Sequence, residues 1–328
     1  MRVPSFDLPP SAYMSEAARR ALIASQARPA SSSAAYDGDI VKRRQMMQEV
    51  YFGPRIERAK ALYPVDIKEQ RIAGVRTDVV TPKAGVAPEN RDRVLIELHP
   101  GGFSIGAGAG LIEAIPMAEK LRVKVISIDY RLGPEHKYPA ATEDVTAVYK
   151  ALLEEYKPEN IAIFGCSAGG LLTAESVAWF QKARLPSPGA IAILAASADA
   201  QFVGDSHYSS APFSGTTVSD RQGGSFEFML RNYFDRVDLR DPLVSPVWSR
   251  DVLAKFPPTL IATGTRAHDM SATVFTHAQL TKAGVTAELH LFDGLPHGYS
   301  LDPELPESID TYDLLVKFFD RHLGGRRH

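Results

Sequence analysis

Residues 161–172, with the sequence IAIFGCSAGGLL, contain the most informative pattern of this chain. The first four residues are apolar and predict a short buried strand, whereas the apolar residues after Gly169 recur at helical spacing. Between these two parts lies a G-x-S-x-G pattern centred on Ser167. A strand, a sharp turn and a helix are the setting in which this pattern presents a nucleophilic serine. We therefore expect Ser167 on a strained turn, with its hydroxyl exposed above a sheet.

Outward from this stretch, predicted strands and helices alternate along most of the chain. Two strands that turn near Ala73 and Gly74 are followed by apolar runs typical of buried strands at 94–100, 124–130, 190–198, 259–265 and 287–292. Helical spacing predicts helices at 140–156, 226–234, 270–283 and 307–323. This alternation predicts an α/β fold with a mostly parallel central sheet and helices on both faces. Ligands of such sheets bind at the carboxyl ends of the strands.

Three segments interrupt this alternation. Residues 11–25 and 39–63 have helical spacing with no strand before them, and residues 201–241 form a long insertion rich in Ser, Gly and aromatic residues. Because the other connections are short, we expect these segments to form a helical cap over a site. The predicted organisation is a cap segment at 1–65 and a catalytic domain at 66–328 that carries the insertion.

Composition and charge limit the partners of the protein. The 328 residues are 45% hydrophobic and 23% charged, as is usual for a globular protein with a large core. The net charge of −2 comes from interspersed charges, so we expect a small, near-neutral substrate and no nucleic acid. Cys166 is the only cysteine, which excludes an intrachain disulfide and a cysteine-based zinc site.

The ends of the chain and its hydropathy bear on location. The first residues lack the pattern of a signal peptide, and no run of about eighteen apolar residues occurs. We therefore expect a cytoplasmic protein without a membrane span.

A serine nucleophile requires a base, because its hydroxyl reacts weakly at neutral pH. The chain has nine histidines. His297 fits best, because its loop follows the strand predicted at 287–292 and so lies at the sheet edge where Ser167 is expected. Its place after the serine in the chain also fits the order found in α/β sheets with this motif.

The oxyanion of an acyl-transfer reaction requires N–H donors. Residues 99–103, HPGGF, follow a predicted strand at the same edge of the sheet. Gly101 and Gly102 are the expected donors because glycine allows the backbone to approach the reacting carbonyl, and Ala168 is the third. Pro100 has no N–H and cannot donate.

Several motifs, read in chain order, resemble those of one known family. They are HPGGF, DYRLGPEHKYPAA, GCSAGG, DPLVSP and DGLPHGY, and they resemble the hormone-sensitive-lipase-like branch of the α/β-hydrolases, a group of carboxylesterases and lipases. The resemblance extends from about residue 70 to the end. It implies an α/β-hydrolase fold with a helical cap, Ser-His-Asp catalysis, no cofactor and no metal. It also implies oxyanion donors at Gly101 and Gly102, a loop-orienting role for His99, and the homodimer common among such esterases.

The chain departs from the family pattern at two positions. Cys166 replaces the aspartate that commonly precedes the nucleophile and bonds the oxyanion loop; we expect a buried, inert thiol and a looser loop. Ala267 stands where relatives have the acid of the triad. Asp269, two residues on, is our predicted acid, because a small shift of its loop brings it within reach of His297. Asp293 is the alternative acid, and Asp241 is expected to be a structural turn residue.

Together these residues predict a serine carboxylesterase for small to medium acyl esters. Ser167 is the predicted nucleophile, His297 the base and then the acid, and Asp269 the residue that orients His297. Two alternatives remain open at this point. One is a small-molecule receptor that has lost catalysis, and the other is a hydrolase of amides, lactones or carbamates, which shares the first chemical steps.

Overall fold

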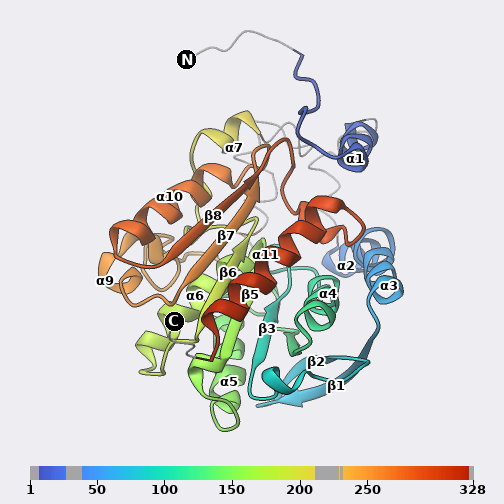
Figure 1. Cartoon of the computed structure of the whole chain (residues 1–328). Coiled ribbons are helices and arrows are strands. Elements are labelled where there is room, and N and C mark those ends of the chain that lie inside the picture. The colour runs from blue at the N-terminus through green and yellow to red at the C-terminus, as the bar shows by residue number, and fades with distance from the viewer. Residues whose placement is uncertain (1–6, 27–38, 211–228, 230–231, 325–328) are drawn as a thin grey trace.

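The computed structural model describes residues 7–26, 39–210, 229 and 232–324. Its centre is one eight-stranded sheet in the order β1-β2-β4-β3-β5-β6-β7-β8 (Figure 1). Neighbours from β4 to β8 pair in parallel, whereas β2 pairs antiparallel with both β1 and β4. The strands are β1 Val65–Ile72, β2 Val75–Pro82, β3 Val94–Leu98, β4 Lys124–Ile128, β5 Ile161–Cys166, β6 Ala190–Leu194, β7 Thr259–Gly264 and β8 Ala287–Phe292. The predicted α/β fold with a mostly parallel sheet is confirmed.

Helices cover both faces of this sheet, as predicted. One face packs against α5 (Ala140–Leu152), α6 (Ala168–Lys182) and α10 (Met270–Lys282), which contribute Val148, Leu172 and Leu280 to one apolar core. The other face packs against α3 (Gly53–Leu62), α4 (Leu111–Leu121) and α11 (Pro306–His322) through a second core. Strands β3, β5, β6 and β7 are buried along their whole length, because both of their faces are covered.

The N-terminal helices lie beside this layered body. They are α1 Glu16–Gln26, α2 Ile40–Met47, the π-helical turn η2 Gln48–Phe52, and α3. Met14 and Leu22 pack against Leu295 and Tyr299, which follow β8. The N-terminal segment therefore contacts the loop on which the sequence places the catalytic histidine.

The remaining elements are short. In the predicted insertion the structure shows α7, Asp205–Ser209, and the predicted helix at 226–234 lies mostly outside the described residues. The others are η3 Pro88–Asn90, η4 Pro158–Asn160, η7 Pro246–Trp248, α9 Arg250–Leu253 and η8 Tyr299–Leu301.

The register of the sheet brings the ends of distant segments together. Gly165 at the end of β5 pairs with Leu98 at the end of β3, and Cys166 pairs with Leu194 at the end of β6. The segments that follow β3, β5, β7 and β8 consequently leave the sheet at one edge, where a site is expected.

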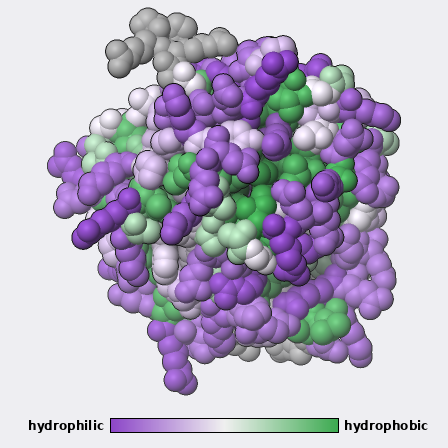
Figure 2. All heavy atoms as spheres, turned by 90° about the horizontal axis from the view of Figure 1, so that it is seen from below, coloured by the Kyte–Doolittle hydropathy of each residue, from purple (hydrophilic) through white to green (hydrophobic). Residues whose placement is uncertain are grey.

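The outer surface is largely polar on the face seen from below the view of Figure 1. There, hydrophilic residues surround smaller groups of hydrophobic ones (Figure 2). Among the described residues, no helix has the length and apolar character needed to span a membrane.

Candidate active site

Ser167 occupies the sharp turn between β5 and α6. Its φ of 56° and ψ of −119° lie outside the regions that a residue with a side chain ordinarily adopts, and its N–H donates to the Leu194 carbonyl oxygen at 2.8 Å. The turn requires glycine on both sides. A Cβ at Gly165 would lie 2.4 Å from the Leu98 carbonyl oxygen, and one at Gly169 would lie 1.7 Å from it. The glycine pattern therefore reflects the close approach of β3 to this turn.

His297 reaches Ser167 from the loop after β8. Its Nε2 lies 3.0 Å from Ser167 Oγ, and its Nδ1 lies 2.6 Å from Asp269 Oδ1. With the proton on Nδ1 donated to Asp269, Nε2 is free to accept the serine proton. The side chain of His297 is 22% exposed whereas that of Asp269 is fully buried. The partly exposed imidazole is therefore hydrogen-bonded to a buried carboxylate.

Asp269 is held in place by further hydrogen bonds at the start of α10. Its Oδ2 accepts from Thr263 Oγ1 at 2.6 Å and from Thr273 Oγ1 at 3.3 Å. Burial alone would raise the pKa of Asp269, but the charge and hydrogen bond of His297 lower it to about 2. Asp269 is thus a carboxylate at neutral pH, in the protonation state that an orienting acid needs.

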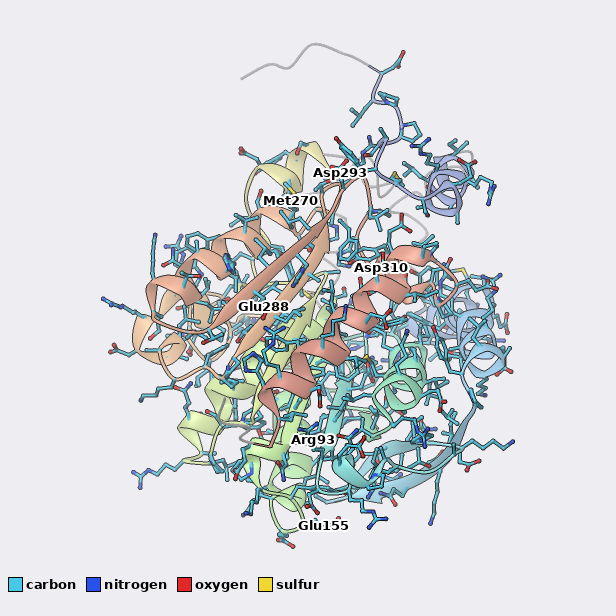
Figure 3. The ribbon with its side chains drawn as sticks, in the orientation of Figure 1. Arg93, Glu155, Met270, Glu288, Asp293 and Asp310 are labelled. Carbon is cyan, nitrogen blue, oxygen red and sulfur yellow. The ribbon has the colours of Figure 1, made fainter. Side chains whose placement is uncertain are left out.

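The other candidate acids lie elsewhere. Asp293 accepts hydrogen bonds from Ser11 Oγ and from Thr265 Oγ1, and Figure 3 shows it at the end of the molecule where the N-terminal segment lies. Asp241 accepts from the Leu243 N–H at 2.9 Å within its own turn, which matches the structural role predicted for it. Of the three aspartates, the structure brings Asp269 to His297.

The glycines of residues 99–103 form a tight turn beside Ser167. Gly101 and Gly102 have φ of 124° and 58°, and a Cβ at Gly101 would lie 2.2 Å from the Ile105 carbonyl oxygen. Within the described part of the chain, no group accepts a hydrogen bond from the N–H of Gly101, Gly102 or Ala168. Ala168 begins α6, where the first N–H groups have no partner within the helix. These three N–H groups are thus candidates for the oxyanion donors that the sequence predicts.

His99 fixes the course of this glycine turn. Its buried ring stacks on Tyr130 with centroids 3.9 Å apart, and its Nδ1 lies 2.8 Å from the Pro100 carbonyl oxygen. The Tyr130 hydroxyl donates to the His99 carbonyl oxygen at 2.7 Å. Burial lowers the pKa of His99, which favours a neutral ring. These contacts agree with an orienting rather than a chemical role.

The side chain of Cys166, the residue before Ser167, lies in the protein core. The side chain is fully buried in the core on the α4 and α11 face, and Ser300 Oγ lies 3.9 Å from its sulfur. Burial, followed by the nearby Glu113 carboxylate, raises the pKa of the Cys166 thiol well above its usual value. Its predicted burial is confirmed.

Glu113 of α4 is a buried carboxyl group that sequence reasoning missed. Its Oε1 accepts from Ser300 Oγ at 3.1 Å, and burial raises its pKa to about 7. Ser300 follows His297 by three residues, so Glu113 is connected to the loop that carries the proposed base.

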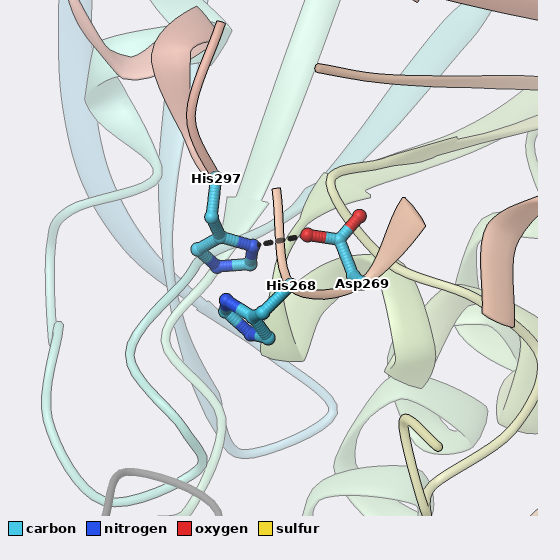
Figure 4. Close-up of side chains that lie close together, drawn as sticks. All are labelled: His268, Asp269 and His297. Carbon is cyan, nitrogen blue, oxygen red and sulfur yellow. Dashed lines mark hydrogen bonds and ion pairs between the residues drawn. The ribbon is translucent and has the colours of Figure 1, made fainter. Parts of the chain in front are cut away.

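The sequence did not predict a role for His268 either, although this residue directly precedes Asp269. The centroid of its ring lies 4.3 Å from that of His297, with the planes inclined by 35° (Figure 4). Burial, followed by the charge of His297, lowers the pKa of His268 to about 3. A neutral second imidazole therefore lies against the proposed base.

Comparison with known proteins gives a consistent family. Residues 95–301 match the family model described as the alpha/beta hydrolase fold. An acetyl-hydrolase of Streptomyces hygroscopicus is 30% identical over 249 residues, which cover 73% of this chain and 79% of that protein. The solved structure of an esterase, E25, is 32% identical and superposes with a TM-score of 0.85 over 98% of this chain and 99% of its own.

A second solved structure extends the comparison. An esterase from the bacterial hormone-sensitive lipase family superposes with a TM-score of 0.77 over 92% of this chain and 96% of its own, at 23% identity. At that identity the likeness concerns the fold.

Proposed function

Because the chain belongs to the alpha/beta hydrolase family and is an ester hydrolase like its relatives, we propose that it is a serine carboxylesterase that uses Ser167, His297 and Asp269 as a catalytic triad. The observation that carries this proposal is the continuous hydrogen-bond chain from Ser167 Oγ through the His297 ring to Asp269, at 3.0 and 2.6 Å. The motifs that resemble the hormone-sensitive-lipase-like branch agree with it.

The first half of the reaction acylates the serine. Ser167 Oγ attacks the ester carbonyl carbon while its proton passes to His297 Nε2, and the carbonyl oxygen becomes an oxyanion. The resulting imidazolium is stabilised by the Asp269 carboxylate, which is ionised at neutral pH. His297 then gives this proton to the alcohol oxygen as the bond between that oxygen and the carbonyl carbon breaks.

Three backbone N–H groups stabilise the oxyanion in this proposal, those of Gly101, Gly102 and Ala168. They come from the loop after β3 and the first residue of α6, which flank Ser167. Donors fixed before the substrate binds cost no reorganisation during the reaction, and removing one such donor typically costs about 10²–10³ in kcat.

The second half of the reaction releases the acid. A water molecule takes the place of the alcohol, His297 accepts its proton, and the hydroxyl attacks the acyl carbon. The tetrahedral intermediate collapses, the bond to Ser167 Oγ breaks, and the serine recovers its proton from His297.

We further propose that the substrates are esters of small to medium acyl groups. One relative, the acetyl-hydrolase of Streptomyces hygroscopicus, supports the short end of this range. A panel of p-nitrophenyl esters from acetyl to decanoyl, compared by kcat/KM, tests the range. A maximum at decanoyl would reject it.

The N-terminal helices and the insertion at 201–241 are proposed as the cap over this site, with the catalytic domain at 66–328. In support, Arg44 of α2 donates to the carbonyl oxygens of Ser104 and Gly133, each at 2.8 Å. Ser104 directly follows the loop that supplies the proposed oxyanion donors.

A receptor without catalysis is the competing function, and covalent labelling separates the two. An organophosphonate reacts with a serine only when a base activates it. Stoichiometric labelling of the native protein supports the esterase, and an unlabelled protein would favour the receptor. The aligned triad gives the receptor no support.

A further inference from the structure

A second histidine beside the proposed base has no part in the reaction described above. One potential ligand atom from each of His268, Asp269 and His297 lies within 4.8 Å of the other two. Figure 4 shows the His268 ring directly beneath the His297 ring, with Asp269 to the side of both. Two imidazoles and one carboxylate are a donor set typical of zinc in proteins.

We propose that His268, Asp269 and His297 bind one zinc ion, and that this ion inhibits the esterase reversibly. The inhibition rests on the proposed role of His297 as the base. Tetrahedral zinc with ligands at about 2.0–2.2 Å places its donor atoms on the order of 3.3 Å apart. Because the donor atoms lie within 4.8 Å of one another, each separation has to close by at most about 1.5 Å when the ion binds.

The surroundings of the three side chains suit an ion that arrives from solvent. The His297 side chain is 22% exposed and His268 is half-buried, so solvent reaches part of both side chains. Asp269 lies to the side of both rings as a buried negative charge, and Thr263 Oγ1 donates to its second oxygen at 2.6 Å. Hydrogen bonds of this kind orient a ligating carboxylate and raise metal affinity.

Zinc at this place blocks catalysis whichever nitrogen of His297 it takes. An ion on Nε2 occupies the lone pair that must accept the Ser167 proton. An ion on Nδ1 displaces the hydrogen bond to Asp269 and leaves the ring proton on Nε2, which then cannot accept one. In both cases the serine stays protonated and the ester is not attacked.

The inhibition is tested by assaying p-nitrophenyl butyrate hydrolysis against zinc chloride in a buffer that does not chelate the ion. We expect zinc to inhibit, EDTA to restore the activity, and magnesium at equal concentration to have no effect, because magnesium prefers oxygen ligands. His268→Asn should raise the inhibitory zinc concentration at least about tenfold, since loss of supporting groups alone costs 10- to 100-fold. His268→Gln serves as a second variant of the same ligand.

A matched control is His290→Asn, which removes a half-buried histidine of β8 that lies beside Glu288 and outside the cluster. It should leave the inhibitory zinc concentration unchanged. Equal zinc sensitivity of the His268 variants and the native protein, or an effect of His290→Asn as large as that of His268→Asn, would overturn the proposal.

Binding is measured independently of catalysis with Ser167→Ala protein and cobalt(II), whose visible absorption reports tetrahedral coordination. One equivalent of cobalt should bind, zinc should displace it, and the additional change His268→Asn should abolish the absorption. Absence of cobalt binding to Ser167→Ala would reject the metal site even where the esterase proposal holds. Binding without any esterase activity of the native protein would reject the proposed function and leave the metal site standing.

Discussion

Ser167 and His297 owe their positions to different kinds of information. The serine lies between glycines that no larger residue could replace, because β3 passes within van der Waals contact of the turn. The histidine is positioned only by the path of the loop after β8. At the scale of single residues, local packing therefore fixes the position of the proposed nucleophile more strictly than those of the proposed base and acid.

The identity of the acid can be tested directly. Asp269→Asn should lower kcat by about 10⁴, because an amide cannot hold the His297 proton on Nδ1 in the required tautomer. The matched change Asp293→Asn should leave kcat within about tenfold of the native value, since Asp293 bonds Ser11 and Thr265. Steady-state kinetics with p-nitrophenyl butyrate decides between them. The reverse order of effects would assign the acid to Asp293.

Glu113 gives the protein a pH-dependent stability. The folded state keeps the Glu113 proton up to a pH of about 7, whereas the unfolded chain loses it above about 4.5. The free energy of unfolding consequently falls as pH rises between these values, by on the order of 3 kcal/mol. Glu113→Gln should remove this loss. The free energy of unfolding of the variant, relative to that of the native protein, should therefore increase as the pH rises from 4.5 to 7.5.

Urea unfolding at both ends of that range measures the effect of Glu113. A difference between variant and native protein that does not change with pH would contradict the assigned pKa.

Residues that sequence reasoning missed share a physical reason. His268 and Glu113 act through neighbours that only the folded chain supplies, His297 in one case and Ser300 in the other. The motif that indicates Ser167 is local, whereas these contacts join segments far apart in the chain. The sequence left the choice between Asp269 and Asp293 open for the same reason. The path of each loop in the folded chain determines which aspartate reaches His297.

At the scale of elements, the sequence predicted most strands closely because their apolar runs are continuous. β8 matches its predicted run at both ends, and β5, β6 and β7 begin where their runs begin. Helix α4 was not predicted. It contains Pro116, a residue that usually interrupts helices, and it follows a run of glycines and alanines without clear periodicity.

Helix α2 has a testable influence on the active site. Arg44 donates to two backbone carbonyls near the glycine turn and forms a two-pronged ion pair with Glu135 at 2.7 Å. Arg44→Ala should lower kcat/KM by about tenfold through misplacement of the proposed oxyanion donors. It should also destabilise the fold by about 1–2 kcal/mol.

Arg58→Ala on α3 is the matched control for Arg44→Ala. It breaks an exposed ion pair with Glu304 and should change neither quantity measurably. Equal kcat/KM for the Arg44 variant and the native protein would show that α2 does not position the loop.

At the scale of the whole molecule, the order of the strands follows from pairing across long sequence separations. β4 lies between β2 and β3, an arrangement that no local pattern predicts. The continuous apolar character of the strands does predict a mostly parallel sheet that is covered on both faces. Because the carboxyl ends of parallel strands lie at one edge, the loops that follow them meet there. This is why fold class and the rough place of the site were predictable, whereas the docking of Met14 against Leu295 was not.

The central claim, that the sheet edge activates Ser167 for attack on an ester, is tested most directly by locating a covalent label. The native protein is treated with an organophosphonate, digested, and analysed by mass spectrometry beside the Ser167→Ala protein. We predict one adduct per chain, on the peptide that contains Ser167, and no adduct on the variant, together with loss of p-nitrophenyl butyrate hydrolysis. An adduct at another residue, or native-like hydrolysis by Ser167→Ala, would contradict the claim.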